Sequence, residues 1–304
     1  MDKKIKKSKK IKKPLGYITL RDNSKKPIYP TNDFFINYTY EKEENWMNLR
    51  TMVNIYLNAY AEKHKKQDGF HLVDENIKVK TQYMHFLNPE TSQPAQDFKI
   101  DEVDSKNLTF VEIQDRTASK PPIPIRAHNY THMAISKADE KAKISQIWFL
   151  GEVNNALHGK GKAFSNFRWK DDVSGNYYPL EVNLMFISLP RLAKEKTVCG
   201  ELSRFLLGEI SDVTSEVLKP IADMLKQECE IFVKNEEVIE SMTIVELRSA
   251  EAREIGIEMG REEERKQSKQ IISQLKERKS PEDIADDLGV SLWLVNEWKD
   301  MLGL

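Results

Sequence analysis

The chain has 304 residues, of which 31% are charged and 39% apolar, a composition that fits a globular protein of one large or two modest domains. Its net charge of −1 hides an asymmetry, because residues 1–13 hold eight Lys and one Asp, a net of +7, and leave −8 for the remainder. No apolar run approaches the roughly 20 residues of a membrane span, and no apolar stretch follows the Lys-rich start as it would in a secretory signal. Cys199 and Cys229 are the two cysteines, which argues against a disulfide scaffold or a Cys-rich zinc module. We expect a cytoplasmic protein with no membrane partner.

The first 190 residues predict an α/β layer structure. Residues 1–27 read as a basic disordered arm, interrupted by prolines and able to contact phosphate. An amphipathic helix is expected over residues 45–65 from its apolar spacing. The expected strands are residues 77–86, 97–100, 108–114, 145–150 and 182–188, with a helix over residues 125–143 between the third and fourth strands. This order of helices and strands predicts a mixed sheet flanked by helices.

After Pro190 strand patterns disappear and helical ones dominate. Helices are expected over residues 201–207, 215–234 and about 243–279. The last of these is rich in Glu, which favours a solvated helix or one packed on a partner. The predicted domain organisation is therefore a disordered arm, a sheet-bearing domain, a helical extension and a short terminal hairpin, with bounds 1–27, 28–190, 191–279 and 280–304.

Chemistry is most strongly indicated around the strand at residues 108–114. Side chains alternate along a strand, so Glu112 and Gln114 project from one face. If the strand that begins near Asp97 pairs with this one, Asp97 and Glu112 converge at one end of the sheet, where the Ile113 carbonyl is also available. Two carboxylates and a carbonyl form a hard oxygen site suited to Mg²⁺ or another divalent cation. A solvated hairpin edge is the alternative for so short a pattern.

An ordered set of short motifs resembles the Rpn family of recombination-promoting nucleases and transposases, within the PD-(D/E)xK nuclease superfamily. The set covers about residues 30–279. Its members are Thr31-Asn32-Asp33-Phe34-Phe35, Leu57-Asn58-Ala59, Asp97 with Glu112-x-Gln114, Arg126 with Tyr130, and Met259-Gly-Arg-Glu-Glu-Glu. The resemblance implies a restriction-endonuclease-like fold and metal-dependent DNA cleavage.

The same resemblance implies roles for individual residues. Asp97 and Glu112 would bind the metal and, with Gln114, form the catalytic set. Gln114 stands where the superfamily usually has Lys, and its neutral amide can orient groups only by hydrogen bonds.

Because Gln114 is neutral, a positively charged side chain at this site must come from another residue. Lys99 and Arg126 are candidates for the missing positive charge, although an ion pair with Asp or Glu is the alternative for each, and Tyr130 joins them as a candidate substrate-binding residue. Asp33 is either a further acidic contributor or a helix N-cap.

Two other patterns invite a functional interpretation. His128 and His132 have the i, i+4 spacing of a zinc pair, but no Glu follows His128 as a HExxH site requires, so ordinary surface histidines are favoured. Residues 284–298 have helix-turn-helix spacing, with Gly289 in the turn and Ser291 as N-cap. Residues 280–304 nevertheless carry six acids and one base, so we favour packing or association over DNA readout.

The leading hypothesis is a Mg²⁺-dependent DNA endonuclease linked to recombination or a mobile element, with DNA as its partner. A catalytically inactive DNA-binding or scaffold protein on the same fold is the alternative. A third hypothesis makes the C-terminal helices an assembly module, through which the chain would form a homo-oligomer.

Overall fold

The computed structural model describes residues 12–64, 71–81, 97–114, 122–135, 143–168 and 182–303. The chain folds into two compact units, Met1–Ser241 and Met242–Leu304. The first unit holds both the predicted sheet-bearing segment and the first part of the predicted helical extension. Helix α9 begins in the first unit and continues into the second.

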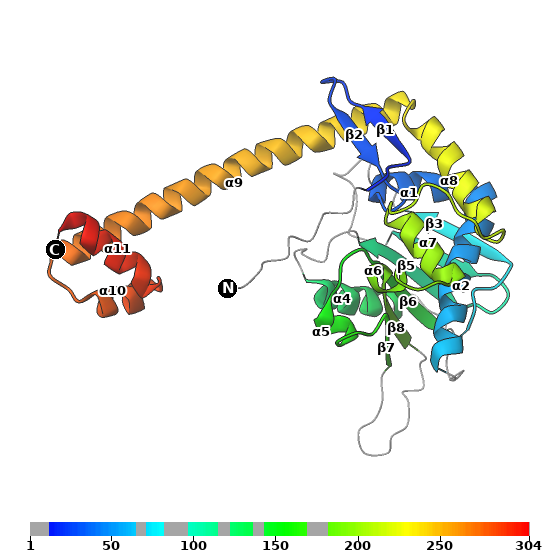
Figure 1. Ribbon diagram of the computed structural model, residues 1–304, viewed down its shortest axis with the longest axis horizontal. Helices are drawn as coiled ribbons and strands as arrows, with labels where there is room; N and C mark the ends of the chain where they lie inside the picture. Colours follow the sequence, from blue (N-terminus) through cyan, green and yellow to red (C-terminus); the bar gives the residue numbers. More distant parts are fainter. Residues whose placement is uncertain are drawn as a thin grey trace, which may run out of the picture. The chain divides into compact units, whose positions relative to one another are not determined.

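The described part of the first unit contains a mixed sheet and a separate hairpin (Figure 1). The sheet has the order β3-β4-β5-β6-β8-β7. Its strands are β3 (Ile77–Thr81), β4 (Phe98–Glu102), β5 (Leu108–Gln114), β6 (Ile144–Leu150), β7 (Phe164–Arg168) and β8 (Val182–Ser188). Strands β3, β4 and β5 pair antiparallel, β5, β6 and β8 pair parallel, and β7 returns antiparallel to β8. The predicted α/β class with a mixed sheet is confirmed.

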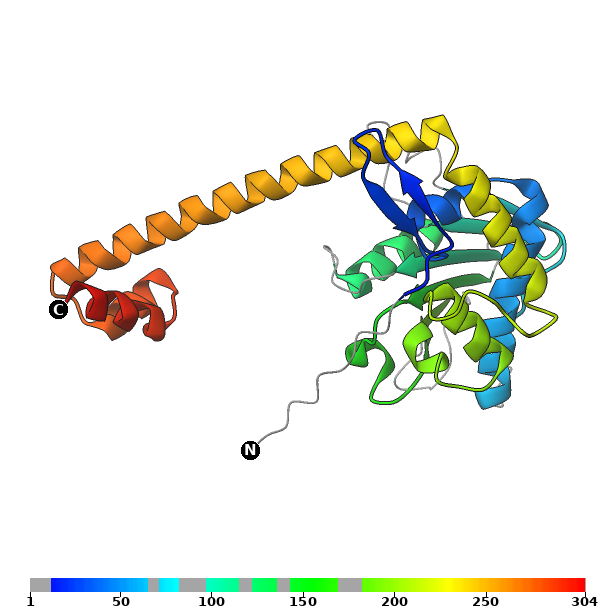
Figure 2. The same ribbon diagram turned by 45° about the horizontal axis from the view of Figure 1, so that its top comes forward.

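Helices lie on both faces of this sheet (Figures 1 and 2). The described helices that lie wholly within the first unit are α1 (Asp33–Tyr40), α2 (Trp46–His64), α4 (Ile123–Ile135), α5 (Asn155–His158), α6 (Leu189–Leu192), α7 (Val198–Leu206) and α8 (Lys219–Phe232), with a 3₁₀ turn η1 (Glu43–Asn45). On one face Tyr40 of α1 meets Phe98 edge-on, and Tyr56 of α2 meets Phe149. On the other face Tyr130 of α4 stacks on Trp148 at 5.9 Å between ring centroids. Because side chains alternate along β4, β5 and β6, each strand contributes to both layers.

The predicted elements agree closely with the observed ones where periodicity is regular. The strands expected at 108–114 and 182–188 have those bounds, and α2 matches its predicted helix to within a residue. Helix α4 begins at Ile123 rather than 125, because Pro124 fits in a first helical turn, where no backbone N–H is needed. Residues 82–86 of one predicted strand and 136–142 of the predicted helix lie outside the described residues.

The prediction of a disordered arm over residues 1–27 is wrong for its second half. Residues 1–11 lie outside the described part, but β1 (Gly16–Thr19) and β2 (Lys25–Ile28) form an antiparallel hairpin in which Tyr17 pairs with Pro27. Asn23 takes the left-handed conformation at the turn, with φ +64°. Proline is tolerated here because an edge strand need not donate from every backbone N–H. Strand β7 was also not predicted.

In the second unit, the end of α9 (Glu236–Lys276) packs with α10 (Pro281–Leu288) and α11 (Leu292–Leu302). Gly289 has φ +62° at the C-terminus of α10, and the Ser291 hydroxyl accepts the N–H of Leu294 as the N-cap of α11. The predicted helix-turn-helix spacing is confirmed as geometry. The core of this hairpin also includes Ile271 and Leu275 of α9. Among the described residues, no helix is both long and apolar enough to cross a membrane.

Candidate functional site

Asp97 and Glu112 lie side by side at one end of the β4–β5 pair. Asp97 directly precedes β4, and its neighbour Phe98 pairs with Val111, so the antiparallel register carries Asp97 next to Glu112. The backbone N–H of Asp97 donates to Glu112 Oε2 at 3.2 Å, and the N–H of Ile113 donates to Asp97 Oδ2 at 2.7 Å. Both residues are buried, at 6% and 2% exposure. The structure therefore brings together the two carboxylates that the sequence separates by fifteen positions.

Burial and neighbouring negative charge make these two carboxyl groups hard to ionise. Burial raises the pKa of Asp97 well above its usual value, and the carboxylates of Glu112 and Asp33 add to the rise. Burial also raises the pKa of Glu112 to about 7, although the Arg126 guanidinium and the N–H of Asp97 oppose that rise. Close carboxylates with raised pKa values form a site that a cation stabilises.

Arg126 is the cation closest to this pair among the charged groups predicted for the site. Its guanidinium forms an ion pair with Glu112 Oε1 and donates to the side-chain carbonyl of Gln114 at 2.7 Å. It also lies over the rings of Trp148 and Tyr130, 5.4 and 5.9 Å from their centroids. The ion-pair alternative raised for Arg126 is the arrangement observed.

Gln114 projects from the same face of β5 as Glu112, as the period of two predicted. Its amide nitrogen lies 3.2 Å from both Glu112 Oε1 and the Ile113 carbonyl oxygen, and donates to them. The Ile113 carbonyl is therefore engaged rather than free, because the long Gln side chain folds back onto its own strand.

The remaining predicted site residues are Lys99, Tyr130 and Asp33, and each has a different structural setting. The Lys99 ammonium is bound to Asp101 on its own strand at 2.6 Å, in the ion pair that was the alternative for this residue. Tyr130 of α4 is buried in an apolar cluster with Trp148 and Phe186, and the Arg126 guanidinium lies over its ring. Asp33 is the first residue of α1, and the N-cap is Asn32, whose side chain accepts the Phe35 N–H at 2.9 Å.

One residue of the site was missed at the sequence level. Asn37 is fully buried on α1, donates to the Asp33 carbonyl at 2.9 Å, and its side chain hydrogen-bonds to Asp97, which lowers the pKa of that carboxyl. The available signal was a lone amide within the apolar run Phe34-Phe35-Ile36-Asn37-Tyr38. Helix α1 thus contributes both polar contact and negative charge to the pair.

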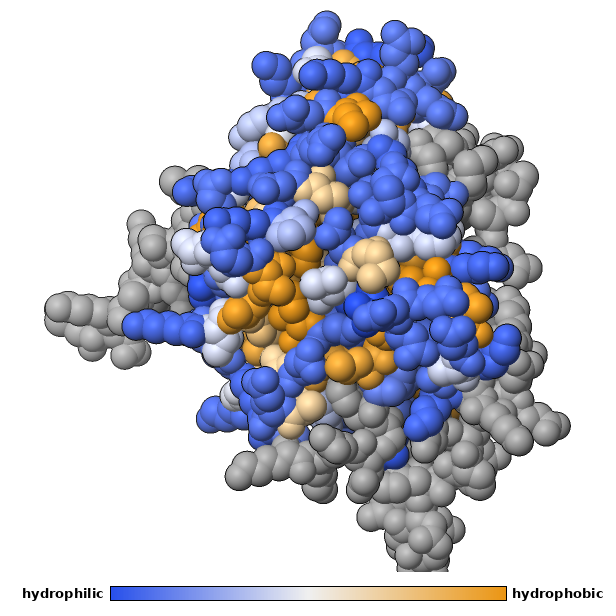
Figure 3. Space-filling model, turned by 90° about the vertical axis from the view of Figure 1, so that its right-hand side faces the viewer, coloured by the Kyte–Doolittle hydropathy of each residue, from blue (hydrophilic) through white to orange (hydrophobic). Residues whose placement is uncertain are grey.

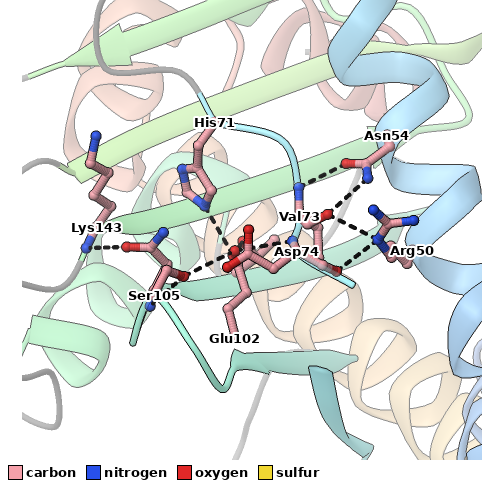
Figure 4. Close-up of polar contacts among 10 residues, drawn as sticks. Arg50, Asn54, His71, Val73, Asp74, Glu102, Ser105 and Lys143 are labelled. Carbon is pink, nitrogen blue, oxygen red and sulfur yellow. Dashed lines mark hydrogen bonds and ion pairs between the residues drawn. The ribbon is translucent and has the colours of Figure 1, made fainter. Parts of the chain in front are cut away.

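A second buried polar cluster, also not predicted, surrounds Glu102 (Figure 4). His71 Nε2 lies 2.9 Å from Glu102 Oε1, and the carboxylate accepts from the Asp74 N–H and from the hydroxyls of Ser105 and Thr109. From α2, Arg50 and Asn54 bind the backbone of the same segment. The contacts of His71, Asp74, Arg50 and Asn54 hold residues 71–74 between helix and sheet.

A shallow groove of about 380 Å³ lies between α2 and the start of α7. Its lining mixes apolar residues with the Lys63–Glu195 ion pair. Figure 3 shows a largely hydrophilic surface on one face of the molecule, with apolar side chains gathered near its middle. The groove does not border Asp97 or Glu112 in its lining, so it is separate from the carboxylate pair.

Comparisons with family models, with curated proteins and with solved structures find no match to this chain. Within the described ranges, no group of three or more His, Cys, Asp or Glu side chains is placed to hold a metal ion.

Proposed function

We propose that the chain is a divalent-metal-dependent DNA endonuclease of the Rpn type, on a restriction-endonuclease-like fold, with its site at Asp97 and Glu112. The observation that carries the proposal is the pairing of these two buried carboxylates across adjacent strands, each with a raised pKa. The mixed α/β sheet and the order of the motifs support the same assignment.

The donor chemistry fits a hard divalent cation. Carboxylate oxygens, such as those of Asp97 and Glu112, are the ligands that Mg²⁺ prefers. A cation would offset both the loss of hydration on burial and the repulsion from Asp33. When bound, the ion would acidify a water molecule and neutralise charge on a phosphodiester.

The neighbouring side chains then have distinct tasks. Gln114, held between Glu112 and Arg126, orients groups by hydrogen bonds. Arg126 holds a permanent positive charge beside the pair and supplies the cation that Gln114 lacks. Because Arg126 contacts Glu112 Oε1, a bound cation and this guanidinium would share the Glu112 carboxylate.

A plasmid-nicking assay tests the activity. Wild type, Glu112→Gln and Asp97→Asn are incubated with supercoiled DNA, with Mg²⁺ or with a chelator. Asp101→Asn is the matched control, because Asp101 lies on the same strand and is bound to Lys99. Nicking by wild type and Asp101→Asn, with Mg²⁺ only, supports the proposal. Equal nicking by wild type and Glu112→Gln refutes it.

The second candidate function, a catalytically inactive DNA-binding or scaffold protein, is favoured by one specific observation. Arg126 already balances the charge of Glu112, so the observed arrangement is neutralised internally. Mn²⁺ binding, followed by electron paramagnetic resonance, separates the two candidates. If the protein binds DNA, and Glu112→Gln binds as much Mn²⁺ as wild type does, the protein is the inactive one.

A further inference from the structure

The two histidines of α4 point their ring nitrogens at each other. His128 and His132 are both exposed, and their Nε2 atoms lie 3.1 Å apart. Their ring centroids are 4.5 Å apart, with the ring planes at 81°. The spacing of the two residues favoured ordinary surface histidines, because a sequence does not show whether two rings one helical turn apart converge.

The backbone that carries the pair is firmly attached to the sheet. Ala127 is fully buried, and Thr131, also buried, donates its hydroxyl to the Ala127 carbonyl at 2.9 Å. Gln146 of β6 donates to the Thr131 hydroxyl at 2.7 Å. These contacts fix the helix through the residues that directly precede each histidine, so a ligand that binds both rings need order only their side-chain torsions.

The distance between the nitrogens matches metal chelation. Two imidazole nitrogens at hydrogen-bond distance share one proton, so at least one of them presents a lone pair to the other. A transition-metal ion binds such nitrogens at about 2.0–2.1 Å, which spaces two cis ligands by about 3 Å. An ion that replaces the shared proton lies off the line between the two nitrogens, so each ring turns about its side-chain torsions to direct its lone pair at the ion.

We propose that His128 and His132 form a chelating site for a borderline divalent transition metal, of the class of Zn²⁺, Ni²⁺ and Cu²⁺. Imidazole selects these ions over Mg²⁺ and Ca²⁺, which prefer oxygen ligands. The pair is exposed, so water completes the coordination. The site is independent of the proposed nuclease function, since it uses nitrogen donors on the solvent side of α4 rather than the carboxylates at Asp97 and Glu112.

Titration of untagged full-length protein with Ni²⁺, followed by calorimetry, tests the site. Loss of an outer-shell partner alone weakens metal affinity by about 10- to 100-fold, so His128→Gln and His132→Gln should each weaken binding by at least about tenfold. His64→Gln, a change at an exposed histidine of α2, is the matched control and should bind as wild type does.

Cu²⁺ electron paramagnetic resonance supplies a direct readout of the ligands. Wild type should give the hyperfine pattern of two imidazole nitrogens, and each single variant that of one. Wild-type affinity in both histidine variants, or an absence of Ni²⁺ binding in wild type, would each overturn the proposal. Because both histidines are exposed, the variants should fold normally, and circular dichroism checks this.

Discussion

Arg126 binds the carboxylate of Glu112 and the side-chain carbonyl of Gln114, so a single guanidinium from α4 engages two neighbouring side chains on one face of β5. The Glu112 side chain is 2% exposed and that of Arg126 is 18% exposed. The pair is thus a buried ion pair in which each partner depends on the other for charge compensation.

Removal of Arg126 should destabilise the protein strongly. Arg126→Ala leaves the Glu112 carboxylate buried without its cation, and breaking a buried pair in this way costs about 3–5 kcal/mol in the free energy of unfolding. Urea unfolding at neutral pH measures the change. Arg21→Ala is the control, because the Arg21–Glu240 pair is exposed at 62% and 54%, and such pairs contribute about 0–1 kcal/mol. Similar losses in the two variants would contradict the assigned role of Arg126.

The stability of the protein should depend on pH through Glu112. Its pKa is raised from 4.5 to about 7 in the folded state, so the folded chain holds a proton that the unfolded chain releases at lower pH. The stability that this group contributes is complete below its unfolded pKa and is lost as pH rises through about 7. Asp97 shifts in the same direction.

Glu112→Gln should therefore lose less stability than wild type between about pH 5 and pH 8. Urea unfolding across this range gives the two slopes. Glu240→Gln, a change at an exposed carboxylate, should follow the wild-type curve. Parallel curves for wild type and Glu112→Gln would show that the Glu112 carboxyl does not titrate in this window.

Glu102 should hold the segment at residues 71–74 in place. Glu102→Ala removes the acceptor for His71, the Asp74 N–H and two hydroxyls, and leaving buried polar groups unsatisfied costs about 1–3 kcal/mol each. We expect a loss of at least about 2 kcal/mol, together with faster hydrogen exchange at the Asp74 amide. Glu75→Ala, where the side chain is 87% exposed, should change neither measurement.

Phe232 should be central to the packing of α8 on α1. Its ring meets Phe34, Phe35 and Tyr38 edge-on, with centroids 5.2–5.8 Å away. Phe232→Ala should cost about 3–5 kcal/mol, the range for truncation of a buried aromatic side chain. Thermal and urea unfolding measure it, and Phe167→Ala, at a ring 49% exposed, should cost far less. A loss no greater than that of the control would place Phe232 outside the stabilising core.

Much of the local structure was predictable because its causes are local. The apolar spacing of α2 and the alternation along β5 specify their own elements, since each follows from the geometry of a helix or a strand. Gly289 and Ser291 similarly predict the turn between α10 and α11. The end of one helix favours a residue in the left-handed conformation, and the start of the next favours a hydroxyl cap, so both signals depend only on nearby backbone. The hairpin at residues 16–28 was missed because prolines and charge obscured two short strands.

The same distinction between local and long-range causes applies to the candidate site. Strand periodicity alone places Glu112 and Gln114 on one face, and the order of the residues puts the Asp97 carboxylate within reach of them. The Arg126–Glu112 ion pair, the contact of Asn37 with Asp97 and the convergence of His128 and His132 became visible only in the folded chain. Pairing across strands and helices depends on register and side-chain rotamers, which are fixed by packing of the whole unit rather than by neighbouring residues.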